Sequence, residues 1–309
     1  MSHRHRTVAL AAVLLAGSAF AQSACLDQSY LPSSLTNGLE VTANQPVTQT
    51  FTCGRSGQLV QVEVSRIRHH NGVTTNPLTV DVVLTDASGT PTTTSLATVV
   101  VQPANITTGA AAPLPIDLSA FNVQVQQGQV LGLALTSPNG PGTPSYAWWG
   151  TAPGGAYAGG QIFIQQTVGL SVWDLAFQTW VSVPASAVVY GAGHPGTTGV
   201  PGIASSAPPV LGTTPDLLIG NPAGAATLGA LFFGLSQANV PTPFGGTALV
   251  VPLTSIGFAA PAAGTAVPFA IPNDGALCGF VIDMQAVLID GGASQGLAFT
   301  PGLELVLGD

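Results

Sequence analysis

The stretch VQVEVS at residues 60–65 alternates apolar and polar side chains without interruption. Its three valines are expected on one side of an extended chain, with Gln61, Glu63 and Ser65 on the other. A period of two gives a strand one buried face and one solvated face, which is typical of antiparallel sandwiches. The stretch therefore predicts a β-strand with a core side and a water side.

The same alternation recurs along most of the chain, for example at residues 78–85 and 130–136, with Gly, Pro and Asn between the runs. No segment keeps a 3.6-residue period over three turns, so the fold class is all-β. We expect a jelly-roll-like β-sandwich over residues 22–185 and a second β-sandwich module over 208–309. Residues 186–207 are rich in Gly and Pro and are predicted to be a linker.

The first 21 residues have the form of a signal peptide. A basic segment at residues 3–6 precedes an apolar run, and Ala19-Phe20-Ala21 places small residues before a cleavage site at Gln22. The apolar run is shorter than the roughly 20 residues of a membrane span, and no later segment resembles one. We therefore expect a secreted protein, extracellular or at the cell surface.

The net charge of the chain limits the kinds of molecule that it is expected to bind. The chain contains no lysine, and after cleavage its three arginines face 13 acidic residues, a net charge of 3 − 13 = −10. Nucleic acids and anionic membranes both require a basic surface, so neither is an expected partner.

Three cysteines in a secreted chain indicate an oxidising compartment. We expect Cys25 to pair with Cys53 and Cys278 to remain a buried thiol, although three cysteines allow other pairings.

Two glycine motifs invite a catalytic interpretation. Residues 292–296, GASQG, match the G-x-S-x-G nucleophile elbow, but that motif needs a following helix and a later histidine, and none follows His194. Residues 191–196, GAGHPG, match a dinucleotide fingerprint, but Pro195 and the glycines after it forbid the required helix. Both are predicted to be loops, and the chain is not expected to be an enzyme.

Metal sites are also weakly indicated. His69 and His70 are adjacent on a strand, so they point to opposite faces and are not expected to share a metal. No cofactor is expected, with calcium at Asp27 or Asp174 kept as an alternative because both lie near the ends of the first domain. Scattered carboxylates leave a secreted hydrolase as a further alternative, without identifying a catalytic pair.

The aromatic residues give the clearest functional pattern. All four tryptophans lie between residues 148 and 180. One of the adjacent pair at 148 and 149 must face outward, and Trp180 lies on the side of its strand opposite Phe177. An outward tryptophan can stack on a sugar ring or a partner surface, or it can pack beneath a loop or the second domain. The predicted ligand contacts are Trp148, Trp149, Tyr157 and Trp180, with Asn139 and Gln178 as polar partners.

Residues 190–196, YGAGHPG, begin a segment that continues through Pro209-x-Leu-Gly212, Ile271-Pro-Asn-Asp274 and Leu303-x-Leu-x-Leu-Gly308. This half resembles an uncharacterised Gly/Pro-rich β-sandwich module at the C-terminus of secreted bacterial proteins. With Gln49-Thr-Phe-Thr, Gln129-Val-Leu-Gly-Leu and residues 174–180, the first half is weakly similar to carbohydrate-binding jelly rolls. Neither resemblance implies catalytic residues.

Together these features predict a secreted, non-catalytic protein that binds extracellular polysaccharide or cell-surface components. Its second domain would serve as a structural or attachment module. A purely structural or adhesive component of the cell exterior is the alternative from another class.

Overall fold

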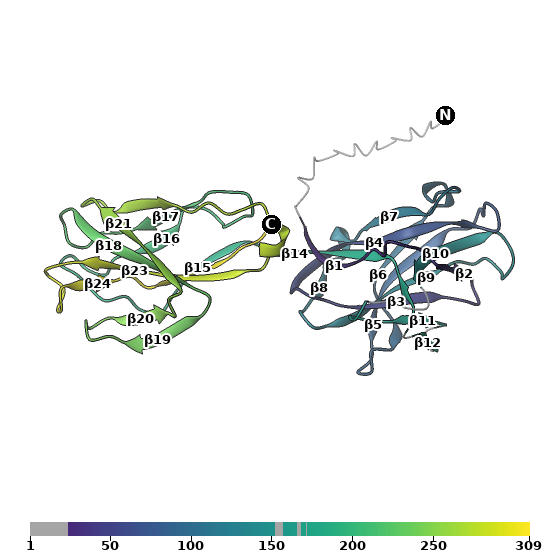
Figure 1. Cartoon of the computed structure of the whole chain (residues 1–309), viewed down its shortest axis with the longest axis horizontal. Coiled ribbons are helices and arrows are strands. Elements are labelled where there is room, and N and C mark those ends of the chain that lie inside the picture. Colours follow the sequence, from purple (N-terminus) through teal and green to yellow (C-terminus); the bar gives the residue numbers. More distant parts are fainter. Residues whose placement is uncertain (1–23, 152–156, 166–167, 171) are drawn as a thin grey trace, which may run out of the picture.

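The computed structural model describes residues 24–151, 157–165, 168–170 and 172–309 (Figure 1). The predicted signal peptide lies outside this range. The described chain consists of antiparallel strands and three short 3₁₀ helices, which confirms the all-β class. Within it, no helix is both long enough and apolar enough to cross a membrane.

Strands β1 to β14 form the N-terminal domain. One sheet has eight strands, in the order β1-β14-β4-β10-β13, with β2 also on β10 and β7 and β8 also on β4. These strands are β1 (Cys25–Tyr30), β2 (Asn37–Val41), β4 (Gly57–His70), β7 (Ala112–Asp117), β8 (Val123–Val125), β10 (Ser145–Thr151), β13 (Asp174–Leu175) and β14 (Phe177–Ser182).

The second sheet of this domain has six strands in the order β12-β11-β3-β9-β5-β6. They are β3 (Val47–Thr52), β5 (Leu78–Thr85), β6 (Pro91–Val101), β9 (Val130–Thr136), β11 (Ile162–Ile164) and β12 (Val168–Leu170). The 3₁₀ helices η1 (Pro103–Asn105) and η2 (Ser119–Phe121) lie in the connections. In Figure 1, β4, β7 and β10 lie on the upper side of the domain, and β3, β5, β11 and β12 on the lower side.

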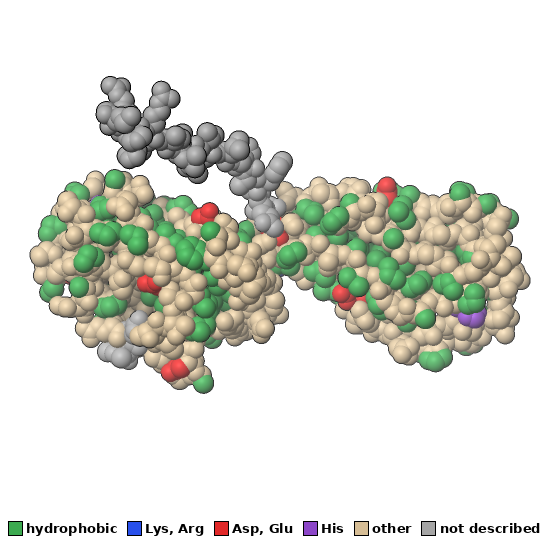
Figure 2. Space-filling model, turned by 180° about the vertical axis from the view of Figure 1, so that it is seen from behind, with side chains coloured by type: hydrophobic (Ala, Val, Ile, Leu, Met, Phe, Trp, Pro, Cys, Tyr) green, Lys and Arg blue, Asp and Glu red, His purple; other side chains and the backbone are tan. Residues whose placement is uncertain are grey.

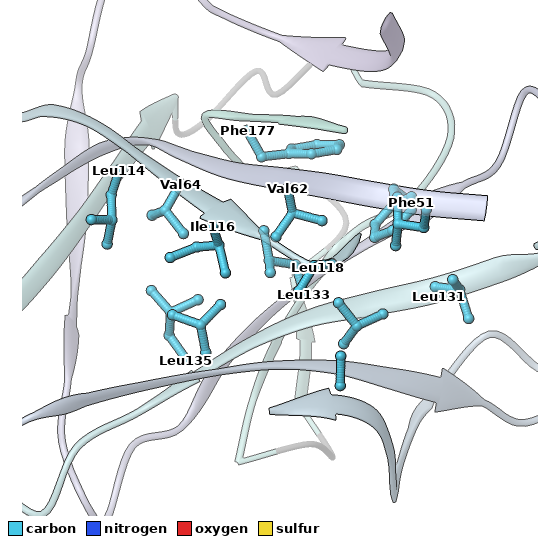
Figure 3. Close-up of a cluster of buried hydrophobic side chains, with 14 of the residues drawn as sticks. Phe51, Val62, Val64, Leu114, Ile116, Leu118, Leu131, Leu133, Leu135 and Phe177 are labelled. Carbon is cyan, nitrogen blue, oxygen red and sulfur yellow. The ribbon is translucent and has the colours of Figure 1, made fainter. Parts of the chain in front are cut away.

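The core of the domain lies between the two sheets (Figure 3). Val62 and Val64 of β4 and Phe177 of β14 meet Leu133 and Leu135 of β9, all fully buried. The alternation read from the sequence is therefore the pattern that fills this core.

Two irregularities in β4 change the alternation that the sequence predicts. Pairing with β14 skips Val60, and pairing with β7 shifts register between Val64 and Ile67. Val60 is only half-buried, and Ser65, expected on the water side, is fully buried. After the second irregularity the even-numbered residues point outward, because an extra residue in a strand reverses its two faces.

The C-terminal domain begins earlier than the sequence predicted. Residues 186–207, predicted to be a linker, contain β15 (Ser186–Tyr190) and β16 (Ile203–Ser205). β15 pairs with β25, and β16 pairs with β17, so both belong to C-terminal sheets. The linker prediction was wrong because Gly and Pro exclude a helix but not short edge strands.

The main C-terminal sheet has the order β15-β25-β23-β18-β21, with β24 also on β23. A three-stranded sheet, β16-β17-β22, and the pair β19-β20 complete the domain. The remaining elements are β17 (Asp216–Ile219), β18 (Thr227–Gly234), β19 (Gln237–Pro241), β20 (Thr247–Val250), β21 (Thr254–Ala260), β22 (Thr265–Pro268), η3 (Gly275–Leu277), β23 (Val281–Ile289), β24 (Leu297–Phe299) and β25 (Gly302–Val306). A separate core around Leu231, Met284 and Leu305 lies in this domain.

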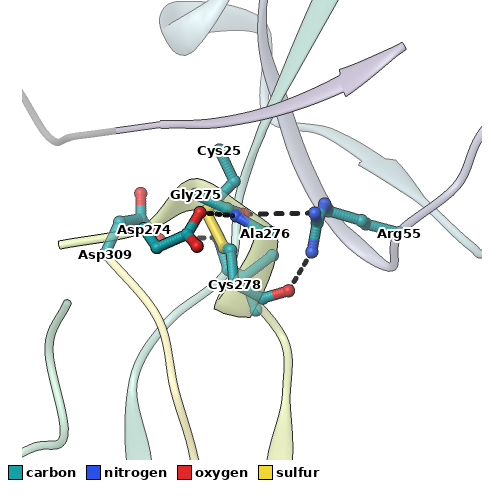
Figure 4. The surroundings of a disulfide bond; sticks show 8 residues. Cys25, Arg55, Asp274, Gly275, Ala276, Cys278 and Asp309 are labelled. Atoms are coloured by element: carbon teal, nitrogen blue, oxygen red, sulfur yellow. Dashed lines mark hydrogen bonds between the residues drawn. A yellow bond between two sulfur atoms is a disulfide. The ribbon is translucent and has the colours of Figure 1, made fainter. Parts of the chain in front are cut away.

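A disulfide joins the two domains (Figure 4). It connects Cys25, at the start of β1, with Cys278, just after η3. Arg55 of the N-terminal domain donates hydrogen bonds to the carbonyl oxygens of Cys278 and Gly275 in the same loop. The junction is therefore both covalent and hydrogen-bonded.

The predicted Cys25–Cys53 pairing is wrong. Cys53 is a free thiol, 1% exposed, and burial raises its pKa to about 12. The partner of Cys25 lies 253 residues away, in a loop that only the packing of the second domain brings near β1. Sequence proximity favoured the shorter loop, but tertiary packing selects the longer one.

This pairing predicts one reactive thiol in the unfolded, unreduced mature protein and three after reduction. Peptide mapping should recover a cross-linked peptide that contains Cys25 and Cys278. A linked Cys25–Cys53 peptide would contradict the structure. A Cys53→Ser variant, as control, should keep the cross-linked peptide and lose the single free thiol.

Candidate ligand-binding face

The outer face is defined here as the side of the eight-stranded sheet that points away from the six-stranded sheet. One row across it runs from Leu26 of β1 through Trp180 and Gln61 to Asp117 of β7. The neighbouring residues Thr179 and Val181 of β14 are fully buried. Alternation along β14 therefore places Trp180 outward, as the sequence predicted.

Gln178 lies one row further along β14, opposite Ser29 of β1 and Glu63 of β4. Its amide nitrogen donates to the Ser29 hydroxyl oxygen at 3.1 Å. Trp180 and Gln178 are both half-buried, so each keeps accessible surface on the outer face. A ligand could therefore reach both of these predicted contact residues.

Trp149 of β10 also faces outward, and its indole lies over Gly38 of β2. A methyl group added at Gly38 would approach the Trp149 ring to 2.7 Å, so the glycine makes room for the ring. The guanidinium carbon of Arg68 lies 5.0 Å from the ring centroid, within the range of a cation–π contact. Trp149 is thus held between a glycine and an arginine rather than left bare.

Arg68 belongs to a group of side chains that the sequence analysis did not single out. Beyond the irregularity at Ser65, Arg66, Arg68 and His70 are half-buried and outward, while Ile67 and His69 are buried. Trp148 pairs with Ile67, which places Trp149 level with Arg66. The alternation in RIRHH at residues 66–70 was the sequence feature that could have revealed this group. Which of its residues point outward depends on the bulge, which the sequence did not predict.

Trp148 and Asn139, both predicted as ligand contacts, are buried. Trp148 is fully inaccessible, and its indole nitrogen donates to the Ala176 carbonyl oxygen at 2.8 Å. The Asn139 side-chain oxygen accepts hydrogen bonds from Thr74 and Asn76. Both predictions were wrong, because these side chains satisfy their polar groups internally and present no surface to a ligand.

Tyr157, a further predicted contact, also points inward. Its ring meets Phe177 edge-on at 5.1 Å, and its hydroxyl donates to the Gln28 side-chain oxygen at 2.9 Å. Burial raises the pKa of Tyr157 above its usual range. The prediction of an outer-face contact was therefore wrong, since the ring anchors the loop before β11 to the core.

The calcium alternative involves two carboxylates with different partners. Asp174 accepts hydrogen bonds from the Tyr157 backbone amide and the Gln49 side chain, and Asp27 accepts from the Gly54 amide. Burial raises the pKa of both carboxyls, and these hydrogen bonds oppose the shift. In the part of the chain that the structure describes, no group of three or more His, Cys, Asp or Glu side chains could hold a metal. Calcium binding at Asp27 or Asp174 stays a prediction.

The G-x-S-x-G segment forms the turn between β23 and β24, not a strand-to-helix elbow. Ser294 nevertheless lies 3.0 Å from Nε2 of His194, the histidine that precedes it in the chain. Nearby, Asp290 accepts hydrogen bonds from the backbone and hydroxyl of Thr197 and from the Gly292 backbone amide. These contacts join the loop after β15 to the β23–β24 turn.

The C-terminal domain contains an apolar cleft of about 310 Å³ beneath the β19–β20 pair. Phe232, Phe244 and Phe299 form much of its wall, and the buried Gln285 side chain has its polar atoms bonded to neighbouring backbone groups. Exposed apolar side chains continue beyond it, including Leu228, Leu253 and Ile289. Figure 2 shows hydrophobic side chains spread over the surface of this domain.

Comparison with known proteins gives no family assignment. No protein-family model and no curated protein sequence matches the chain. Among solved structures, a β-D-mannosidase from Dictyoglomus thermophilum aligns at 12% identity and a TM-score of 0.18, over 81% of this chain and 28% of that one. A putative β-galactosidase from Bacteroides fragilis aligns at 13% identity and a TM-score of 0.17, over 84% and 30%. The chain thus spans less than a third of either protein, and similarity this low supports no argument about function.

The burial of Trp148 predicts a strong asymmetry between two tryptophan variants. Trp148→Ala should lower the free energy of unfolding of the N-terminal domain by about 3–5 kcal/mol, because it leaves a large cavity. Trp180→Ala, on the half-exposed outer face, should cost about 1 kcal/mol or less. Urea unfolding followed by circular dichroism measures both. Equal losses would mean that Trp180 is also a core residue.

The Asp290 contacts predict that the C-terminal domain loses part of its free energy of unfolding at acidic pH. Burial alone would raise the pKa of this carboxyl, but hydrogen bonds from Thr197, Gly292 and Ala293 outweigh it and lower the pKa below the ordinary 3.8. The stabilisation is therefore fully present above pH 3.8 and is lost as the pH falls through the lower folded-state value.

Asp290→Asn should accordingly reduce the stability of the domain at pH 7 by about 1–3 kcal/mol, because an amide nitrogen cannot accept these bonds. The difference from wild type should shrink towards pH 2. Urea midpoints between pH 7 and pH 2 measure this, with Asp216→Asn as a control of equal charge change. A difference that does not vary with pH would contradict the assignment.

Proposed function

We propose that the protein is a secreted binding protein whose outer face holds an extracellular polysaccharide. One observation carries the proposal: the outer face presents the half-exposed indole of Trp180 at one level and the stacked pair of Trp149 and Arg68 at another, with polar side chains between them. Indoles and planar polar groups are the side chains that stack on sugar rings and hydrogen-bond their hydroxyls.

The spacing of the two indoles suits an extended chain. Trp180 is level with Gln61 and Trp149 is level with Arg66, about five residues apart along β4. With one bulged residue discounted, four steps of about 3.3 Å give a separation of roughly 13 Å. Gln178 and Glu63 lie within this interval and offer hydrogen bonds to hydroxyls. A polymer of several sugar units would span the face, whereas a single sugar would meet only one indole.

The positions of the four cavities found among the described residues also favour a polymer over a small ligand. None of the four described cavities is lined by Trp149, Gln178 or Trp180. A shallow surface gains affinity by contacting many units of a repeating ligand, since each contact alone is weak.

The structural or adhesive alternative rests on the C-terminal domain. Its exposed apolar residues adjoin an apolar cleft, and such a surface is suited to contacts with other chains. This domain can serve attachment while the outer face of the first domain binds the polysaccharide.

Affinity electrophoresis of residues 22–309 through gels with and without soluble polysaccharides tests the proposal. We expect retardation by at least one polysaccharide, with at least tenfold weaker binding in Trp180→Ala/Gln178→Ala. Val100→Ala changes an exposed apolar residue of the opposite sheet and serves as the control that should bind normally. No retardation by any polysaccharide, or equal retardation of all three proteins, would falsify the proposal.

A further inference from the structure

The outer face also carries an unusual set of cationic groups. Arg66 and Arg68 are two of only three arginines after residue 21, in a chain without lysine. They extend from the same side of β4, two residues apart, so their strand positions are about 7 Å from each other. His70 continues the row, and Trp149 of the neighbouring strand β10 lies level with Arg66 at its other end.

Neither arginine is neutralised by the protein. Arg66 donates a hydrogen bond to the carbonyl oxygen of its neighbour Ser65, and Arg68 lies against the Trp149 ring. No ion pair to a carboxylate involves either one anywhere in the described ranges. Two acidic residues of the outer face accept hydrogen bonds from hydroxyls instead, Glu63 from Ser65 and Glu40 from Ser145.

Two buried donors at this position also have no acceptor. Nε of Arg68 and Nε1 of Trp149 are both inaccessible and without a hydrogen-bond partner in the described structure. A buried donor without an acceptor costs about 1–3 kcal/mol, so such groups are rare in folded proteins unless a ligand engages them. Small local shifts on binding would bring both donors to an acceptor-rich ligand.

The chemistry of these groups selects the ligand class. Two guanidinium groups form paired hydrogen bonds to planar carboxylates, and the half-exposed Trp180 on the same face suits the apolar face of a sugar. The net charge of 3 − 13 = −10 after residue 21 opposes polyanions of every kind, so selection must come from the local geometry of these groups and not from overall charge. We infer that the ligand is an acidic polysaccharide that carries carboxylate groups, and that Arg66 and Arg68 bind those carboxylates. This inference rests on the polysaccharide binding proposed above.

Polygalacturonate and its fully methyl-esterified form share one backbone and differ in charge, so they are the probes. Wild type should be retarded by polygalacturonate at least tenfold more strongly than by the methyl ester. Arg66→Gln/Arg68→Gln should lose that preference, while Arg66→Lys/Arg68→Lys, which keeps the charge but loses the planar fork, should retain part of it. Thr93→Glu/Gln102→Glu, at one position within β6 of the opposite sheet and one directly after it, lowers the net charge by the same two units and should bind as wild type.

The outcomes separate this inference from the proposed function. Equal binding of the two polymers, or undiminished binding by Arg66→Gln/Arg68→Gln, overturns the inference and leaves polysaccharide binding intact. Binding to polyglutamate as strong as to polygalacturonate also overturns it, because charge alone would then suffice. Failure to bind any polysaccharide overturns both. Circular dichroism and urea midpoints establish that each variant is folded.

Discussion

Strand β4 is the element on which the N-terminal domain depends, because it pairs with β14 and β10 as well as with β7 and β8. A strand with so many partners can change register only where an extra residue is accommodated, and β4 does so twice. The second bulge has a direct functional consequence. It buries Ser65 and turns Arg66, Arg68 and His70 outward, whereas strict alternation from Val62 would have directed the two arginines into the core. Burial of unpaired guanidinium groups would be prohibitively costly, so the bulge is what makes this sequence compatible with a sandwich.

The junction between the domains leaves this face open. Cys25 pairs with Val181 at the edge of the eight-stranded sheet, and the next residue, Leu26, lies opposite Trp180 on the outer face. The C-terminal domain is therefore attached near the Trp180 end, while β4 carries Arg66 and Arg68 away from it. The disulfide fixes the attachment, and the hydrogen bonds of Arg55 to the η3 loop and the packing of Leu211 and Val306 against the N-terminal core support it.

The sequence predicted the fold class because alternation is a local property that sheet packing preserves, as Val62, Val64 and Phe177 show. It also placed Trp180 and Gln178 correctly on the water side of β14. The predictions that failed concern features that depend on distant parts of the chain. The Cys25–Cys278 bond and the pairing of edge strand β15 both involve residues of the second domain that lie far away in the sequence. For Trp148 and Trp149 the sequence showed that one must face inward, but only the pairing of β10 with β4 decides which.

The scarcity of charge bears on how an acidic ligand would be recognised. Basic proteins draw anionic polymers from a distance through their overall field, which speeds association and makes binding strongly dependent on salt. Here the overall field repels an anion, because acidic residues outnumber the arginines. Attraction must then arise at short range, from Arg66 and Arg68 against the Trp149 surface. Added salt weakens that local attraction and also screens the overall repulsion, so the two effects oppose each other. Recognition on this face would therefore depend less on ionic strength than on the geometry of the guanidinium groups. That geometry is a local property and does not follow from the net charge of the protein.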